Sequence, residues 1–160
     1  MTRSCTPVSA RTRPGQEARA RAIAGEEQAA ITKISEAAEI ATSQDEVAPP
    51  WIYYYTPGFF EIQRGIVFHH LGADSPKRNA QAVGLLTAGL DGIEPEARRA
   101  EWAGVYICHL VEAHARAGNL DTATTLLAEA RAVAATTRSA KVSRRVAGLA
   151  RKYGLSLDCP

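Results

Sequence analysis

Apolar side chains recur along most of this chain at steps of three and four residues, the spacing of one face of an α-helix. The pattern begins at about Gln16 in an Ala-rich stretch that ends near Thr42, with room for a separate short helix before Gly25. Residues 43–50 lack the pattern and close on two prolines, which predicts a linker. The aromatic run 51–55 has no second strand candidate to pair with, so we interpret it as the approach to a helix.

Five further helices follow from start and stop signals in the remaining sequence. They are expected over about 57–72, 75–90, 94–118, from 121 onward, and 139–154. Ser75, Asp121 and Ser139 are the expected N-caps, and Gly72 and Gly154 are natural helix ends. Together with the N-terminal stretch this gives six or seven helices and no sheet. The predicted fold class is therefore all-α.

Three stretches of the chain share the same spacing of small and bulky residues. Gly25, Ala30, Ile34 and Ala37 follow steps of five, four and three; Gly118, Ala123, Leu127 and Ala130 repeat them; Ala82, Leu86 and Gly89 repeat the last two, with Gly72 further upstream. Small residues let two helices approach closely, and the bulky residue fills the groove between neighbours. The pattern resembles the tetratricopeptide repeat, which implies antiparallel helix pairs stacked as a short tetratricopeptide-like superhelix. Coincidental spacing in an Ala-rich helical bundle is the alternative.

A further set of motifs is more specific. It comprises Trp51, residues 53–55 and 65–72, the pair Arg98-Arg99, the turn Ala117-Gly118-Asn119 and the ending 137–145. These motifs resemble the C-terminal helical-repeat region of large actinobacterial transcriptional regulators of the Xre type. The resemblance implies a sensing or dimerisation region that binds a peptide or another subunit. Residues 1–15 are too short to hold the helix-turn-helix of those regulators, so direct DNA binding is not implied.

Composition fits one globular domain, because 46% of the 160 residues are hydrophobic and 22% are charged. Residues 1–15 lack apolar periodicity, which predicts a disordered basic arm before a helical-repeat domain over 16–155 and a tail over 156–160. The sequence has no apolar run of membrane-spanning length and no secretory signal, so we expect a cytoplasmic protein. The three cysteines are expected to be free thiols.

Charge is segregated along the chain although the net charge is only +2. Residues 138–152 hold six basic side chains and no acidic one, whereas 25–137 hold 8 basic and 15 acidic ones. Solvated helix faces are the ordinary interpretation. The alternative is a nucleic-acid-binding protein that contacts phosphate through its basic C-terminal helix. The residues of that alternative are Arg138, Lys141, Arg144, Arg145 and Arg151.

Candidate chemistry is sparse. The sequence has no nucleophile elbow, no Gly-rich phosphate loop and no His-Glu-x-x-His motif, so we expect a non-enzymatic protein. His69 and His70 diverge by about 100° on a helix, and His109 and His114 lie five residues apart and off one face. We therefore expect neither a metal site nor a cofactor, with the histidines at the edge of the core.

The expected function is a protein- or peptide-interaction module whose partner is a peptide, a protein or a second copy of the chain. In stacked helix pairs the first helix of each unit lines the concave side, and grooves there accept peptides through apolar anchors. The candidate partner-binding residues are Tyr54, Gln63, Arg64, Arg99, Trp102 and Tyr106. The aromatic residues near Tyr54 are interpreted either as packing between units or as a partner contact.

Overall fold

The structure, a computed structural model, describes residues 7–42 and 57–157 of the chain. Every regular element within these ranges is an α-helix, which confirms the all-α prediction. The helices are α1 (Pro7–Ile23), α2 (Glu27–Thr42), α3 (Pro57–Leu71), α4 (Pro76–Asp91), α5 (Pro95–Arg98), α6 (Glu101–Arg116), α7 (Leu120–Thr137) and α8 (Ala140–Tyr153). The predicted linker over 43–50 and the aromatic run 51–55 lie outside the described residues.

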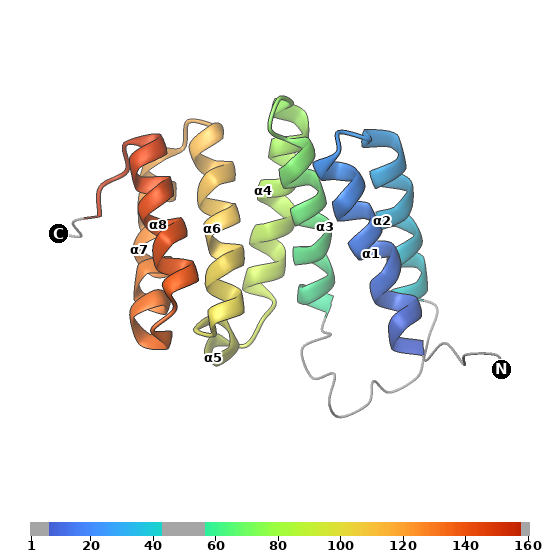
Figure 1. Cartoon of the computed structure of the whole chain (residues 1–160), viewed down its shortest axis with the longest axis horizontal. Coiled ribbons are helices and arrows are strands. Elements are labelled where there is room, and N and C mark those ends of the chain that lie inside the picture. Colours follow the sequence, from blue (N-terminus) through green and yellow to red (C-terminus); the bar gives the residue numbers. More distant parts are fainter. Residues whose placement is uncertain (1–6, 43–56, 158–160) are drawn as a thin grey trace.

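The long helices form pairs that stand side by side along the longest axis of the molecule (Figure 1). Helices α1 and α2, α3 and α4, and α6 and α7 are each packed against one another. Helix α8 packs against both α6 and α7 at one end of the row. This arrangement agrees with the expected packing of helix pairs.

Two glycines of the repeat pattern lie in turns that require a left-handed backbone. Gly25 joins α1 to α2 with a φ of +78°, and Gly118 joins α6 to α7 with a φ of +80°. L-residues with a side chain rarely adopt this conformation, so these positions favour glycine. Gly72 serves the middle pair differently, because a Cβ atom there would lie 2.7 Å from the Asn79 Cα. The same motif position therefore meets a backbone requirement in two units and a packing requirement in the third.

The remaining repeat positions face the interior. Ala30, Ala82 and Ala123 are fully buried, as are the bulky residues Leu86 and Leu127. Close approach is most evident between α3 and α4, where a Cβ atom on Gly89 would lie 2.7 Å from the Gly58 carbonyl oxygen. Small residues at these intervals thus let the paired helices pack backbone against backbone.

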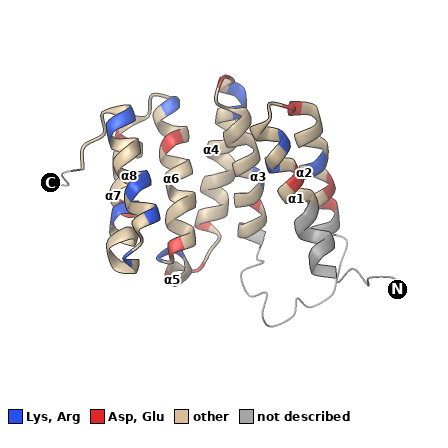
Figure 2. Ribbon diagram, viewed as in Figure 1, with Lys and Arg blue, Asp and Glu red and all other residues tan. Residues whose placement is uncertain are grey.

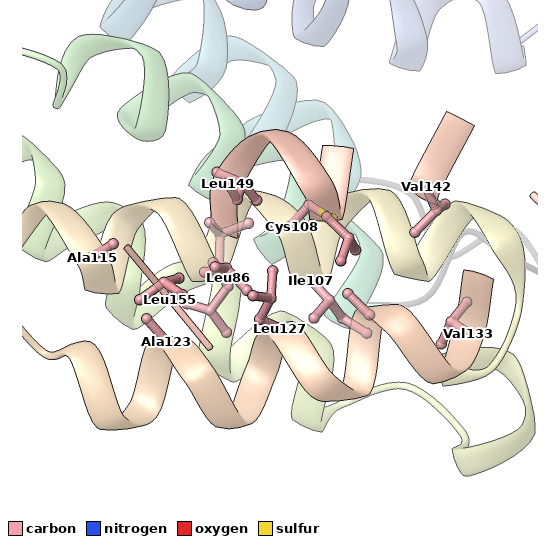
Figure 3. Packing of buried hydrophobic residues seen from close by; sticks show 14 of the residues in the cluster. Leu86, Ile107, Cys108, Ala115, Ala123, Leu127, Val133, Val142, Leu149 and Leu155 are labelled. Atoms are coloured by element: carbon pink, nitrogen blue, oxygen red, sulfur yellow. The ribbon is translucent and has the colours of Figure 1, made fainter. Parts of the chain in front are cut away.

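The hydrophobic core has two parts. The larger cluster joins α3, α4, α6, α7 and α8, and Figure 3 shows its side chains converging from these last four helices around Leu86, Ile107 and Leu127. A smaller cluster joins α1 and α2 to α3 through Val67. The first helix pair is therefore attached to the rest of the chain by a separate and smaller set of apolar contacts.

The capping predictions had different outcomes. Ser75 and Ser139 cap α4 and α8 as predicted, and their hydroxyl oxygens accept the Arg78 and Val142 amide protons. The prediction for Asp121 was wrong, because α7 begins at Leu120, and its N-cap is Asn119, two residues before Asp121. Asp121 instead lies in the first turn, where its negative charge favours the helix N-terminus.

One predicted helix is two helices in the structure. The stretch 94–118 was expected to be continuous, but α5 ends at Arg98 and α6 begins at Glu101. The Arg98 guanidinium contacts Glu129 on α7 at 2.6 Å and Asp91 on α4 at 3.1 Å. These ion pairs hold α5 across the end of the bundle, and the extended Ala100 then redirects the chain into α6. The sequence did not predict the break between α5 and α6, because these contacts join residues that are far apart in the chain.

The N-terminal boundary also differs from the prediction. Residues 1–15 were expected to form a disordered arm, whereas α1 already begins at Pro7. Proline is tolerated in a first helical turn, and the Arg, Ala, Gln and Glu residues that follow are adequate helix formers. Pro14 lies inside this helix at the cost of one backbone hydrogen bond. Residues 1–6 lie outside the described residues.

Candidate functional site

Four helices form a continuous row along one side of the molecule. Helix α1 contacts α3, α3 contacts α6, and α6 contacts α8 (Figure 1). The first three open their helix pairs and α8 extends the series, so we call this set the first-helix row. The side chains between α3, α6 and α8 form two neighbouring groups, one aromatic and one polar.

The aromatic cluster consists of Phe59, Trp102 and Tyr106, with Gln63 beside it. The Phe59 ring lies 6.3 Å from the Trp102 ring and 6.5 Å from the Tyr106 ring, centroid to centroid, with edge-on geometry in both pairs. The Gln63 amide donates a hydrogen bond of 3.2 Å to the Tyr106 hydroxyl oxygen. All four residues are half-buried, so each keeps some surface open to a ligand.

Three of the predicted partner-binding residues, Gln63, Trp102 and Tyr106, are thus brought together. The other three are not part of this group. Arg64 forms a local ion pair of 3.1 Å with Glu61, and Arg99 is exposed in the turn between α5 and α6. Tyr54 lies outside the described residues.

The second group is a histidine cluster formed by His69 and His70 of α3 and His109 of α6. The His109 ring lies 4.6 Å from the His69 ring and 6.0 Å from the His70 ring. His69 and His109 are almost fully buried, whereas His70 is half-buried. From α8, Arg145 Nη2 approaches both ring nitrogens of His109 at 3.3 Å.

Glu112 links the three helices around this cluster. Its carboxylate lies 3.4 Å from His69 Nε2 on α3, 3.2 Å from Arg116 on α6 and 2.8 Å from Lys152 Nζ on α8. The Tyr153 hydroxyl donates a further contact of 3.3 Å. One half-buried carboxylate therefore serves several donors, which leaves it little capacity to neutralise additional cations.

Burial and neighbouring charges change the protonation of these groups. Desolvation lowers the pKa of His109 to about 2 and the pKa of His70 to about 4, with contributions from His69 and nearby arginines. Desolvation also lowers the pKa of His69, although Glu112 partly opposes this shift. The hydrogen bond from His69, together with Lys152 and Arg116, holds the Glu112 pKa far below its usual range. At neutral pH the histidines are neutral and Glu112 is ionised.

Two histidine nitrogens in this cluster have no partner among the described residues. They are His69 Nδ1 and His70 Nε2. Neutral His69 places its proton on Nε2, toward Glu112, so its Nδ1 is an unsatisfied acceptor. Buried polar atoms without partners are uncommon in folded proteins.

The candidate nucleic-acid residues lie on or just before α8 (Figure 2). Arg138, Lys141, Arg144 and Arg151 are exposed, as the hypothesis requires. Arg145 differs, because it is half-buried against His109 rather than directed only to solvent. The structure therefore divides the predicted set into four exposed side chains and one that belongs to the histidine cluster.

The histidine cluster was not predicted from the sequence. We expected His69 and His70 to diverge too far to share a site, but both rings lie close to His109, with their centroids 5.5 Å apart. The prediction considered α3 alone. In the structure α6 packs beside α3, and its His109 lies close to both His69 and His70. Even so, within 7–42 and 57–157 no three His, Cys, Asp or Glu side chains are grouped so that they could hold a metal ion.

A regular offset could have revealed the two groups. Phe59 and Trp102, Gln63 and Tyr106, and His69 and Glu112 are each separated by 43 residues along the chain. The constant offset reflects two neighbouring helices that run in the same direction in fixed register. It is visible in the sequence only after α3 and α6 are assumed to be neighbours.

Comparison with known proteins found no matching family model, no matching curated protein and no matching solved structure. The resemblance to the actinobacterial regulators therefore stays a prediction. In the part of the chain that the structure describes, no helix is both long enough and apolar enough to cross a membrane.

Proposed function

We propose that this chain is a non-enzymatic module that binds a peptide, a protein or a second copy of itself along the first-helix row. The observation that carries the proposal is the half-buried cluster of Phe59, Trp102 and Tyr106, with Gln63 at its edge. Partly exposed aromatic side chains on a rigid scaffold gain apolar contact when a partner covers them, and Trp and Tyr dominate interface hot spots.

The surroundings of this cluster favour recognition over catalysis. Gln63 and the Tyr106 hydroxyl present polar atoms beside apolar rings, as at the edge of a peptide-binding groove. The sequence resemblance to the repeat region of Xre-type regulators supports the same function, as the sensing or dimerisation part of a regulator. Glu112, which lies on α6 with Trp102 and Tyr106, is engaged in ion pairs and ionised, so it is poorly suited to act as a general acid or base at neutral pH.

Selection from a displayed library of random 12-residue peptides tests this function, with the full-length chain as bait. We expect the wild type to enrich peptides, and Trp102→Ala to lose most of that enrichment. Gln63→Lys is a second variant that leaves the aromatic packing intact, and Lys77→Ala on α4 is the control. Light scattering measures self-association in parallel. A wild-type chain that selects no peptide and remains monomeric would contradict the proposal.

A second candidate function has a specific observation in its favour. Arg138, Lys141, Arg144 and Arg151 are exposed, and no ion pair to a carboxylate involves them among the described residues. Such a surface suits the phosphates of a nucleic acid. Titration of a 20-base-pair DNA duplex at increasing salt tests it, because phosphate contacts make affinity fall steeply with salt concentration. Absence of binding at about 50 mM salt would rule it out.

A further inference from the structure

Three basic residues and one glycine of helix α8 form a stripe that turns toward α6. Lys141, Arg145, Gly148 and Lys152 recur at steps of four, three and four residues, so they share one side of the helix. Two contacts fix the direction of this side, since Arg145 reaches His109 and Lys152 reaches Glu112 on α6. We call these four positions the α8 stripe.

Most of the positive charge of α8 has no carboxylate partner in the described part of the chain. Helix α8 contains five basic residues and no acidic one. Among the described residues, only Lys152 of these five has a carboxylate partner, and that partner is Glu112. Glu112 is already shared with His69 and Arg116. Arg145, which is half-buried, faces a neutral histidine instead of a counter-ion.

A partly desolvated guanidinium without a counter-ion is a favourable place for an external anion. Arg145 meets this description, since it is half-buried and its guanidinium contacts the neutral ring of His109.

Gly148 leaves open space in the middle of the stripe. A Cβ atom at this position would have no neighbour within 4 Å. The site therefore lies between Arg145 and Lys152, which flank Gly148 by one turn on either side.

The aromatic cluster lies close to this stripe along the same row. Trp102 and His109 are seven residues apart on α6, which corresponds to about 10 Å along the helix axis. Arg145 adjoins His109. An extended peptide covers that distance in about three residues. One short segment can therefore contact the aromatic cluster with one side chain and the α8 stripe with another.

We propose that the α8 stripe binds the carboxylate side chains of an acidic peptide whose apolar residue contacts the aromatic cluster. This inference rests on the proposed function and specifies the chemistry of the partner: an Asp or Glu about three residues from a large apolar side chain. The carboxylate supplies the counter-charge that Arg145 lacks, and Gly148 provides the space for it.

The test uses the same peptide selection and a pair of variants at the open position. Gly148→Glu places a negative charge in the stripe, and Gly148→Gln is its neutral control of equal size. Gly148 is half-buried, but a Cβ atom there would meet no neighbour within 4 Å, so both variants are expected to fold. We expect selected wild-type peptides to be enriched in Asp and Glu relative to the input library. A synthetic selected peptide, followed by fluorescence anisotropy, is expected to bind Gly148→Glu roughly tenfold more weakly than Gly148→Gln.

The outcomes separate this inference from the proposed function. Selection of peptides without acidic enrichment would overturn the inference and leave the interaction module intact. Acidic peptides that bind both variants equally would also overturn it, because their site would lie elsewhere. Binding of a DNA duplex to the stripe without any acidic peptide would assign the stripe to a nucleic acid instead. Selection of no peptide at all would count against the proposed function itself.

Discussion

Single residues decide how closely α3 and α4 approach. Gly58 and Gly89 face one another across the pair, with their backbones too close for side chains. Gly84 lies in the same helix as Gly89, but a Cβ atom there would meet nothing within 4 Å. Gly89 is therefore required for the close packing of α3 and α4, whereas Gly84, five residues earlier in the same helix, is not.

Alanine at these two positions of α4 is expected to change stability in opposite directions. Gly89→Ala should lower the free energy of unfolding by about 1–3 kcal/mol, because its Cβ would overlap Gly58 and Ile62 backbone atoms. Gly84→Ala should raise it by about 0.5–1 kcal/mol, because glycine is a poor residue in an open helical position. Urea unfolding followed by circular dichroism measures both. Equal effects of the two changes would contradict the assigned packing.

Single residues also make the free energy of unfolding depend on pH, through the histidine cluster. Burial lowers the pKa of His69, His70 and His109 below the value of about 6.5 that an unfolded chain has. Between pH 6.5 and the lower native values, the unfolded chain binds more protons than the native one. The stability that the neutral histidines contribute is thus complete above pH 6.5 and is lost as the pH falls toward their native pKa values.

We expect the free energy of unfolding to fall by about 2 kcal/mol or more between pH 7 and pH 5, since one pKa unit corresponds to about 1.4 kcal/mol. His109→Gln removes one titrating group while keeping an acceptor for Arg145, so the fall should be smaller in this variant. Urea titrations at both pH values measure the difference. A pH dependence that is the same in both proteins would show that His109 is not buried in a neutral state.

At the scale of elements, capping residues link helix ends to their neighbours. The Ser139 hydroxyl accepts the Val142 amide proton at 3.2 Å and donates to Glu101 on α6 at 2.6 Å. Among the described residues, the Ser75 hydroxyl makes only the corresponding cap contact, at 3.4 Å, and Ser75 is half-buried. The cap of α8 therefore also fixes the beginning of α6.

Removal of the two caps should have unequal effects. Ser139→Ala is expected to lower the free energy of unfolding by about 1–2 kcal/mol, because it leaves the Val142 amide and Glu101 without their partner. Ser75→Ala should cost less, because its cap bond is longer and water reaches the site. Thermal unfolding monitored at 222 nm compares the two. A larger loss in Ser75→Ala would contradict this assignment.

The sequence predicted a helix boundary only where the residues that determine the boundary are close together in the chain. Pro57 and Ser139 mark helix beginnings by the chemistry of their own backbone and side chain, and those helices begin as predicted. The division between α5 and α6 depends on Arg98 and its partners on α4 and α7, far away in sequence. A pattern read along the chain carries no information about such contacts. The histidine cluster could not be predicted for the same reason, because its members come together only when α3 and α6 pack in register.

At the scale of the whole molecule, the two-part core predicts unequal local stability. The pair α1 and α2 contacts the remainder through the smaller cluster, in which Val67 is the fully buried contribution from α3. Regions held by few apolar contacts open more readily than the body of a fold. The first pair is therefore expected to be the least protected part of the described chain.

Hydrogen exchange with mass spectrometry tests this expectation through Val67→Ala. Amides of α1 and α2 should exchange faster than in the wild type, by a factor that corresponds to about 2 kcal/mol of lost contact and cavity energy. Amides of α7 and α8 should be nearly unchanged. Val146→Ala, in the larger cluster, is the control that should affect α6–α8 instead. Uniform acceleration in both variants would show a single cooperative unit.

The position of Trp102 has a practical consequence. Its indole is half-buried on the proposed recognition surface, and the chain contains only one other tryptophan, Trp51. Replacement of Trp51 by phenylalanine would leave Trp102 as the single indole chromophore. Ligand that covers it would move its emission maximum to shorter wavelength, because the excited indole responds to the polarity around it. The emission of Trp102 would thus report directly whether the proposed recognition surface is occupied.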